Sequence, residues 1–268
     1  MLLGIDAGNT NMVFAVYRES EILTSWRCNT VAGKTADEYA AWLQFLFEGE
    51  GISFEEISSV LISSVVPDLN FDLKVLAEKY FFAKAHFIRN GDVETGVFVE
   101  MENPQEVGAD RIVNCAAVKA YYSTPAIVID FGTATTFDVI GTNGHYLGGI
   151  IAPGINLSLK ALHNATAQLP LIHIQEPKQT KERNSIIGKN TVQAMQAGIY
   201  WGNISMIEGL VNKISDELDE NQKPEIIATG GLSNLFAKRL QFIDHVDNDL
   251  TLKGLAAIYA LNKEKFRQ

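Results

Sequence analysis

The sequence predicts an α/β fold built from two similar halves, and two observations lead to that prediction. An apolar run that ends on an aspartate, followed by a turn rich in Gly and small polar residues and by a second apolar run, occurs at residues 2–13 and again at residues 127–138. Strand-like and helix-like segments alternate after each copy, which is typical of layered α/β domains. The two aspartates, Asp6 and Asp130, are 130 − 6 = 124 positions apart, nearly half of the 268-residue chain. This spacing suggests a duplicated domain that holds a ligand between its copies.

The first half begins with three strand-like runs joined by short turns. They lie near residues 2–6, 12–17 and 22–28. Thr35 and Glu38 form a capping-box pattern, so we expect a helix to begin there. The elements expected next are a buried strand at 60–66, a helix at 70–82, a short strand at 85–88 and a helix at 111–122 that links the halves.

The second half repeats the three-strand opening at 126–130, 136–140 and 146–152. Pro153 suits the first turn of a following helix. The elements expected after it are a polar surface loop at 175–184, a long helix through 200–214, a strand at 225–229 and a closing helix at 251–261.

Composition and charge limit the classes of partner. Hydrophobic residues make up 47% and charged residues 20% of the chain, as in an ordinary globular protein. The net charge of −10 argues against a nucleic-acid partner, which needs a basic face. It does not argue against ATP, because a local Gly-rich turn and Mg²⁺ can offset an acidic surface.

We expect this chain to be neither a membrane protein nor a secreted protein. No apolar run approaches the roughly 18 residues that a membrane span requires. Asp6 interrupts the first apolar run, and no basic residue precedes that run, so no signal peptide is predicted. Cys28 and Cys115 have no metal or redox spacing, so we expect reduced thiols in a cytoplasmic protein. The five histidines are scattered without the spacing of metal ligands.

The two Asp-containing turns are the first candidate for chemistry. A single Asp after a strand often only stabilises the turn. A carboxylate at two equivalent strand ends is instead an arrangement that holds cations against a polyphosphate. Gly8 and Gly132 let the backbone approach phosphate oxygens, and the polar residues around them supply hydrogen-bond donors. Neither turn has the Lys-Ser/Thr ending of a P-loop, and the chain has no Gly-x-Gly-x-x-Gly pattern.

Two other features have alternative interpretations. Gly230-Gly231 follows a predicted strand, and it is either an ordinary helix-entry turn or a flat surface for a purine. Asp138 is either a second cation ligand or a residue that points away from the site, because side chains alternate along a strand.

Asp110 and Arg111 open the helix between the halves. Phosphoryl transfer to an alcohol requires positioning, charge neutralisation and a group that accepts the hydroxyl proton. Asp110 is a candidate base and Arg111 a candidate carboxylate or carbonyl clamp. The alternative is that Asp110 caps the helix and Arg111 pairs with a surface acid.

The duplicated Asp-x-Gly turn resembles the superfamily of acetate and sugar kinases, Hsp70 and actin. More narrowly, motifs along almost the whole chain resemble the type III pantothenate kinases. These motifs are Asp6-Ala7-Gly8-Asn9-Thr10-Asn11, Ser63-Ser64-Val65-Val66-Pro67, Val107-Gly108-Ala109-Asp110-Arg111, Asp130-Phe131-Gly132-Thr133-Ala134-Thr135-Thr136, Gly148-Gly149-Ile150-Ile151-Ala152-Pro153-Gly154, Thr191 within Thr-x-x-Ala-Met-Gln-x-Gly, and Thr229-Gly230-Gly231.

The resemblance implies two ribonuclease H-like (actin-like ATPase) domains, 1–117 and 118–268, each a mixed sheet flanked by helices, with the active site in the cleft between them. It implies ATP-dependent phosphorylation of pantothenate, the first step of coenzyme A biosynthesis. Mg²⁺ and a monovalent cation (K⁺ or NH₄⁺) would assist, and the enzyme would be a homodimer.

The resemblance also implies roles for individual residues. Asp110 would be the general base, Asp130 would hold the monovalent cation and Asp6 would hold Mg²⁺, directly or through water. ATP would contact Asp6, Ala7, Gly8, Asn9, Thr10, Asn11, Met12, Val13 and Thr133. Pantothenate would contact Met101, Gly108, Ala109, Asp110, Arg111 and Thr191. Family members often carry Tyr where this chain has Met101, and a thioether cannot donate the hydroxyl hydrogen bond.

Two alternatives compete with the pantothenate kinase. One is another kinase or phosphatase of the superfamily, such as a sugar kinase or polyphosphatase, which would carry its catalytic acid in a motif other than Gly-Ala-Asp-Arg. The other is a non-catalytic regulator with the same fold. Intact Asp6, Asp110 and Asp130 count against a regulator, because a non-catalytic copy would be free to lose them.

Overall fold

The structure is a computed structural model that describes residues 1–89, 91, 93–177, 186–218 and 222–267. The chain forms two compact units. Unit 1 contains Met1–Tyr122 together with Asp249–Gln268, and unit 2 contains Ser123–Asn248.

Unit 1 is a five-stranded mixed sheet with helices on both faces. Its strands are β1 (Leu2–Ala7), β2 (Asn11–Arg18), β3 (Glu21–Asn29), β4 (Ser59–Ser64) and β5 (Ala85–Phe87), in the order β3-β2-β1-β4-β5. Its helices are α1 (Ala36–Gly49), α2 (Asn70–Tyr80), α3 (Ala109–Tyr121) and α7 (Leu250–Asn262), with the short 3₁₀ turns η1 (Phe54–Glu56), η2 (Pro67–Leu69), η3 (Pro104–Glu106) and η4 (Lys265–Arg267). The first three strands are antiparallel, and β4 and β5 add in parallel.

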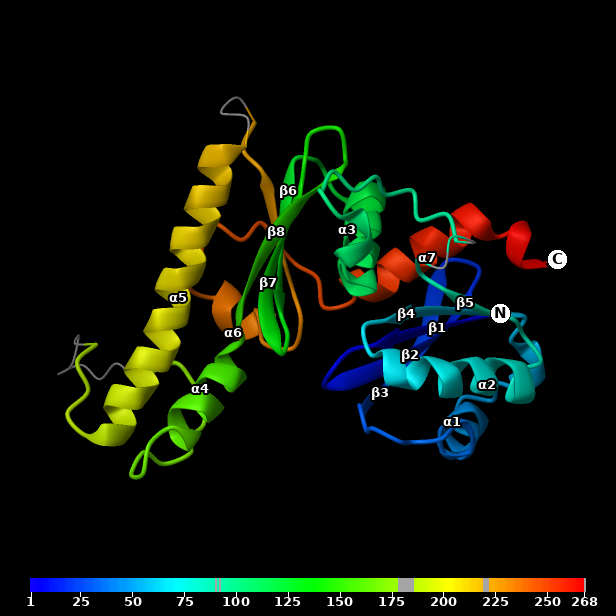
Figure 1. The fold of residues 1–268 in the computed structure, drawn as a ribbon, viewed down its shortest axis with the longest axis horizontal. Helices are drawn as coiled ribbons and strands as arrows, with labels where there is room; N and C mark the ends of the chain where they lie inside the picture. Colours follow the sequence, from blue (N-terminus) through cyan, green and yellow to red (C-terminus); the bar gives the residue numbers. More distant parts are fainter. Residues whose placement is uncertain (90, 92, 178–185, 219–221, 268) are drawn as a thin grey trace. The chain divides into compact units, whose positions relative to one another are not determined.

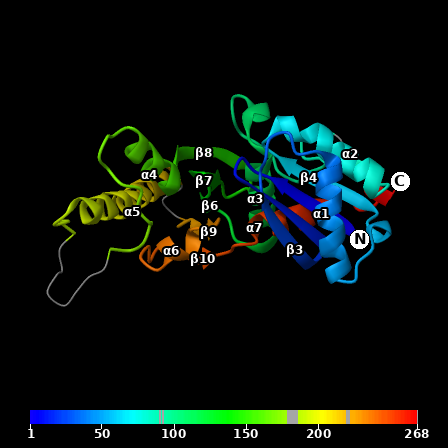
Figure 2. The ribbon, with the colours of Figure 1, turned by 90° about the horizontal axis from the view of Figure 1, so that it is seen from below.

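Helices cover the two faces of this sheet in pairs (Figure 1). Side chains of α1 and α2 pack with alternate residues of the central strands in one continuous apolar core, and Figure 2 shows both helices over that face. On the other face, the Tyr17 hydroxyl donates to the Leu252 carbonyl of α7 at 3.0 Å. Gly254 lets α7 approach α3 closely, since a Cβ there would collide with the Val113 carbonyl. Unit 1 therefore has helices packed on both faces of its sheet.

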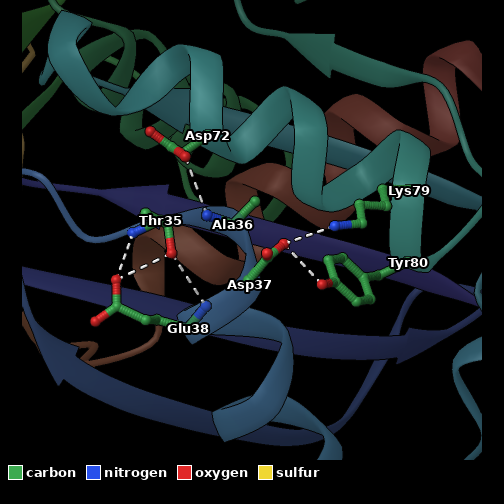
Figure 3. Close-up of polar contacts among 7 residues, drawn as sticks. All are labelled: Thr35, Ala36, Asp37, Glu38, Asp72, Lys79 and Tyr80. Carbon is green, nitrogen blue, oxygen red and sulfur yellow. Dashed lines mark hydrogen bonds and ion pairs between the residues drawn. The ribbon is translucent and has the colours of Figure 1, made fainter.

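The N-terminus of α1 is capped as the sequence predicts (Figure 3). The Glu38 N–H donates to Thr35 Oγ1 at 3.4 Å, and the Thr35 N–H donates to the Glu38 carboxylate at 2.8 Å. A long-range partner joins them, because the Ala36 N–H donates to Asp72 of α2 at 3.0 Å. A carboxylate beside exposed helix N–H groups is favourable, so Asp72 ties the two helices together.

Unit 2 is a second five-stranded mixed sheet. Its strands are β6 (Ala126–Phe131), β7 (Ala134–Ile140), β8 (Tyr146–Pro153), β9 (Glu225–Thr229) and β10 (His245–Val246), in the order β10-β9-β6-β7-β8. Its helices are α4 (Ile155–Asn164), α5 (Thr191–Glu217) and α6 (Ser233–Ala237). Residues of these helices and of alternate strand positions share one apolar core.

The predicted duplication is visible in the order and register of the strands. Read from the opposite edge, the second order is β8-β7-β6-β9-β10, which matches β3-β2-β1-β4-β5 strand by strand. Asp6 of β1 lies opposite Ser63 of β4, and Asp130 of β6 lies opposite Thr229 of β9. Each aspartate therefore occupies the same place in its sheet, with a hydroxyl residue beside it on the parallel neighbour.

The structure differs from the sequence-based expectations in two places, the division into units and the role of Pro153. The division into units falls after Tyr122 and not at 117/118, and residues 249–268 belong to unit 1, because α7 packs on α3 and the first sheet. Pro153 does not open a helix, because it ends β8 opposite Ala134, and Gly154 is the N-cap of α4.

Most of the polar loop expected at 175–184 lies outside the described residues. Among the described helices, none has the length and hydropathy of a membrane span.

Candidate active site

The turn between β1 and β2 is held in place through its carbonyl groups. The Gly8 N–H donates to the Asn11 carbonyl at 3.1 Å, while the Gly8 and Thr10 carbonyls accept from Thr30, its hydroxyl at 2.6 Å and its N–H at 2.9 Å. Asn9 and Thr10 are exposed. Because three carbonyls of the turn have partners inside the unit, the exposed side of the turn suits an anion such as a phosphate.

Asp6 is a half-buried carboxylate at the end of β1. Burial, followed by the negative charge of Asp110, raises the pKa of Asp6 to about 7. The neighbouring Ser63 hydroxyl and the charge of Arg27 lower its pKa by smaller amounts. A bound cation would relieve both the desolvation and the repulsion, so the residues present fit a cation at Asp6.

Asp110 is the second residue of α3, and its position depends on Gly108. Gly108 is the N-cap of the helix, and any Cβ on it would overlap the Asp110 carboxylate and lie 3.4 Å from Val65. Asp110 Oδ1 accepts the Arg111 N–H at 2.8 Å. Burial raises the pKa of Asp110, and that hydrogen bond and the Arg111 guanidinium partly oppose the shift. Asp110 is therefore a half-buried carboxylate of increased basicity at the N-terminus of a helix.

Around Asp110, the other predicted acceptor-site residues of unit 1 lie on consecutive segments. Ala109 is buried at the start of α3, and Arg111 is half-buried beside Asp110. Met101 lies three residues before η3 and is 37% exposed. Gly108 and not Asp110 is the N-cap residue, although the Asp110 carboxylate does accept an N–H at the start of α3.

The turn around Asp130 in unit 2 is one residue shorter than the turn around Asp6. Asp130 pairs with Thr136, 136 − 130 = 6 residues on, whereas Asp6 pairs with Val13, 13 − 6 = 7 residues on. Gly230, at φ +88°, lies against this turn, because a Cβ on it would overlap the Asp130 carboxylate and lie 2.8 Å from the Phe131 backbone. Asp130 is a half-buried carboxylate that carries one negative charge, and this charge is compatible with a monovalent cation.

The remaining candidates of unit 2 lie at helix starts and strand ends. Thr133 is exposed in the turn, and its carbonyl lies against Gly154, where a Cβ would overlap it. Thr191 is exposed at the first position of α5, after the Asn190 cap. Asp138 is fully buried and accepts the Tyr146 hydroxyl at 3.0 Å. The Gly230 carbonyl accepts from the Ser233 hydroxyl at 2.8 Å, so Gly230-Gly231 forms a helix-entry turn. A purine against this turn stays a prediction.

Sequence reasoning missed the residues that support these turns. Thr30, which binds the first turn, is 22 positions from Gly8 and carries no motif of its own. The glycines at 154 and 230 were recognised as motif members, but their close approach to the second turn depends on the folded sheet. The signal that could have found Thr30 is the strand pairing, because Asn11 pairs with Asn29 at the end of the β2–β3 hairpin.

Solved structures resemble the fold at low sequence identity. A Campylobacter jejuni protein named after the Baf family of transcriptional activators has a TM-score of 0.62 and 19% identity, with 98% of this chain and 99% of that chain covered. A Sinorhizobium meliloti protein named as a 2-dehydro-3-deoxygalactonokinase has a TM-score of 0.61 and 12% identity, with 97% and 96% covered. The activator of the 2-hydroxyisocaproyl-CoA dehydratase from Clostridium difficile, with ADPNP bound, has a TM-score of 0.55 and 15% identity, with 98% and 95% covered.

These structures and the two equivalent sheets define the class: the protein has the fold of actin-like ATPases and sugar kinases, with two ribonuclease H-like domains. Residues 2–213 match the family of type III pantothenate kinases. Type III pantothenate kinases of Paramagnetospirillum magneticum and Rhodospirillum rubrum are 47% and 48% identical to it, covering 100% and 98% of this chain and 100% and 99% of their own lengths. The chain belongs to the type III pantothenate kinase family, and it is a kinase.

Proposed function

We propose that this kinase transfers the γ-phosphoryl group of ATP to the primary hydroxyl of pantothenate, giving 4′-phosphopantothenate and ADP in the first step of coenzyme A biosynthesis. Its full-length identity of 47–48% to kinases named for pantothenate supports this substrate. The single structural observation that carries the proposal is the Gly108–Asp110 arrangement. It provides a half-buried base of raised pKa at the start of α3, next to a guanidinium.

The proton transfer is assigned to Asp110. As the hydroxyl oxygen of pantothenate attacks the γ-phosphorus in line with the departing ADP, the hydroxyl proton passes to the Asp110 carboxylate. The burial that raises the pKa of Asp110 also increases the basicity of its ionised form. Gly108, Ala109, Arg111, Met101 and Thr191 are proposed to contact pantothenate.

The phosphates of ATP are assigned to the first turn. Residues 6–13 would bind them through main-chain and side-chain donors of the turn, and Thr133 would contact the nucleotide. Asp6 would hold Mg²⁺, directly or through water, and Asp130 would hold K⁺ or NH₄⁺; these cations supply positive charge against the transferring group. The carboxylates at equivalent sheet positions support a cation at each of them, and the choice of cation rests on the family resemblance.

The test is an ATP-dependent phosphorylation assay with pantothenate and, in parallel, a panel of sugars. Formation of 4′-phosphopantothenate with no sugar phosphate is expected. A sugar phosphate as the main product would favour the sugar-kinase alternative, and no product with any acceptor would favour a regulator. The proposal also includes a cytoplasmic homodimer, and light scattering on the purified protein at twice the 29.5 kDa chain mass would support the dimer.

A further inference from the structure

The segment that carries Met101 has little regular structure of its own. Between β5 and η3 the described residues form no helix and no strand beyond an isolated bridge at Val99. The segment leads through η3 directly to Gly108 and Asp110. A loop that contributes to a binding site must be held in place by groups outside it, or its ordering opposes ligand binding.

The first group that holds the segment is Asn262, the last residue of α7. Its Oδ1 accepts the Glu94 N–H at 2.9 Å, and its Nδ2 donates to the Glu94 carbonyl at 2.7 Å. The same Nδ2 donates to the Ile258 carbonyl one helical turn earlier at 2.8 Å, and Asn262 is 3% exposed. One buried amide thus satisfies both main-chain groups of Glu94, as a neighbouring strand would.

Two residues later, a second contact fixes the same segment. The Lys119 ammonium of α3 donates to the Gly96 carbonyl. Gly96 has φ +68°, and a Cβ on it would lie 2.9 Å from Leu261 of α7. The segment is therefore held from the two helices that pack together on one face of the first sheet.

A third contact closes the other end of the segment. Arg89 Nη2 donates to the Pro104 carbonyl and to Gln105 Oε1, both at 3.0 Å. Residues 97–103, including Met101, therefore lie between the contacts at 94–96 and the contact at η3.

We propose that Asn262 is a positioning residue for the acceptor site, which fixes the backbone that presents Met101 to pantothenate. The proposal rests on the proposed function. It makes the C-terminal helix a determinant of acceptor affinity, although no residue of α7 touches the reacting atoms in the proposed mechanism. Lys119 has the same role through Gly96.

The test compares Asn262→Ala and Lys119→Met with the wild type by steady-state kinetics. We expect the KM for pantothenate to rise about tenfold in Asn262→Ala, the effect of one to two hydrogen bonds. A rise of several-fold is expected in Lys119→Met. The KM for ATP and kcat are expected to stay within about twofold in both variants.

Matched controls separate positioning from simple destabilisation. Asn203 on α5 is also buried and donates to the carbonyl four residues earlier, so Asn203→Ala removes the same bond within a helix of unit 2. Lys74→Met removes an exposed lysine of α2 that pairs with Glu78. Neither control is expected to change the KM for pantothenate relative to that for ATP.

Hydrogen exchange provides a readout that does not depend on activity. The amides of residues 94–101 are expected to exchange faster in Asn262→Ala than in the wild type and in Asn203→Ala. Unchanged exchange, or equal changes in both KM values and kcat, would overturn the positioning role. If the wild type fails to phosphorylate pantothenate, the proposed function fails, while the exchange result still decides whether Asn262 holds the segment.

Discussion

The carboxylate of Asp110 occupies the space that any side chain at Gly108 would need. The obstructing atom is the end of a side chain and not backbone, and the φ of Gly108 is an ordinary −57°. A residue with a Cβ at this position can therefore be accommodated if the carboxylate moves. The absence of a side chain at Gly108 is thus more important for the position of the Asp110 carboxylate than for the formation of the helix.

Gly108→Ala is accordingly expected to lower kcat by roughly 10²-fold, the effect of misplacing a catalytic group by about 1 Å. Its free energy of unfolding is expected to fall by no more than about 1 kcal/mol, because the φ of −57° is allowed for alanine although glycine is the better N-cap residue. Gly49→Ala is the control, because a Cβ at Gly49 meets nothing within 4 Å. Kinetics and chemical denaturation measure the two quantities. A loss of stability without a loss of turnover would contradict the role given to Gly108.

Replacing Asp110 by Asn removes the proton acceptor and keeps the shape of the side chain. Turnover is expected to fall by roughly 10²–10⁴-fold, the usual range for general-base catalysis. The measurement is kcat for pantothenate at saturating ATP. Full activity in this variant would remove Asp110 from the role of base.

The pKa of about 7 at Asp6 predicts a dependence of stability on pH. The folded protein holds a proton at Asp6 up to about pH 7, while the unfolded chain loses it near its ordinary value of 3.8, so the folded state binds more protons between these limits. The free energy of unfolding therefore decreases as the pH rises from about 4 to about 7.

Asp6→Asn removes this ionisation. At pH 8 the variant is expected to be more stable than the wild type without ligands by on the order of 2 kcal/mol, and to have lost most of its kinase activity. Thermal melts of both proteins from pH 5 to pH 8 measure the difference, which should diminish towards pH 5. A variant less stable than the wild type at pH 8 would show that the charged carboxylate is stabilised in the free protein.

Asp130 predicts a requirement for a monovalent cation. Replacing K⁺ and NH₄⁺ by choline at constant ionic strength is expected to suppress activity, and Asp130→Asn is expected to be slow with or without K⁺. Initial rates over a titration of each cation measure this dependence. Indifference of the wild-type enzyme to both cations would exclude the proposed cation site.

Met101→Tyr tests the residue that differs from the common family pattern. The tyrosine hydroxyl adds a donor to a side chain that is already 37% exposed, so kcat is expected to stay within about twofold and the KM for pantothenate to stay equal or fall. The KM measured for wild type and variant decides this. A large loss would show that the segment around Met101 is shaped for a thioether.

Much of the fold could be predicted because local sequence patterns reveal the duplication. The Asp-turn-strand pattern at residues 2–13 and 127–138 fixes a hairpin by its own sequence, and the register of Asp6 and Asp130 follows from it. The membership of α7 in unit 1 could not be predicted, because it depends on a contact between Gly254 and Val113 that no local pattern contains.

The same reason limits the prediction of the site. Asp110 could be proposed from its motif, but the dependence of its position on Gly108 is a matter of three-dimensional packing. Thr30 and Asn262 bind main-chain atoms of distant segments. Any residue can supply those main-chain atoms, so no sequence pattern marks the partner.

The return of α7 to unit 1 has a consequence for synthesis of the chain. Residues 249–268 are translated after all of unit 2, so a growing chain must complete the second unit before the first can acquire its last helix. Until then the face of α3 that contains Val113 lacks its covering partner. Unit 2 is contiguous in sequence, so it can reach its final form while the unit that was synthesised first is still incomplete.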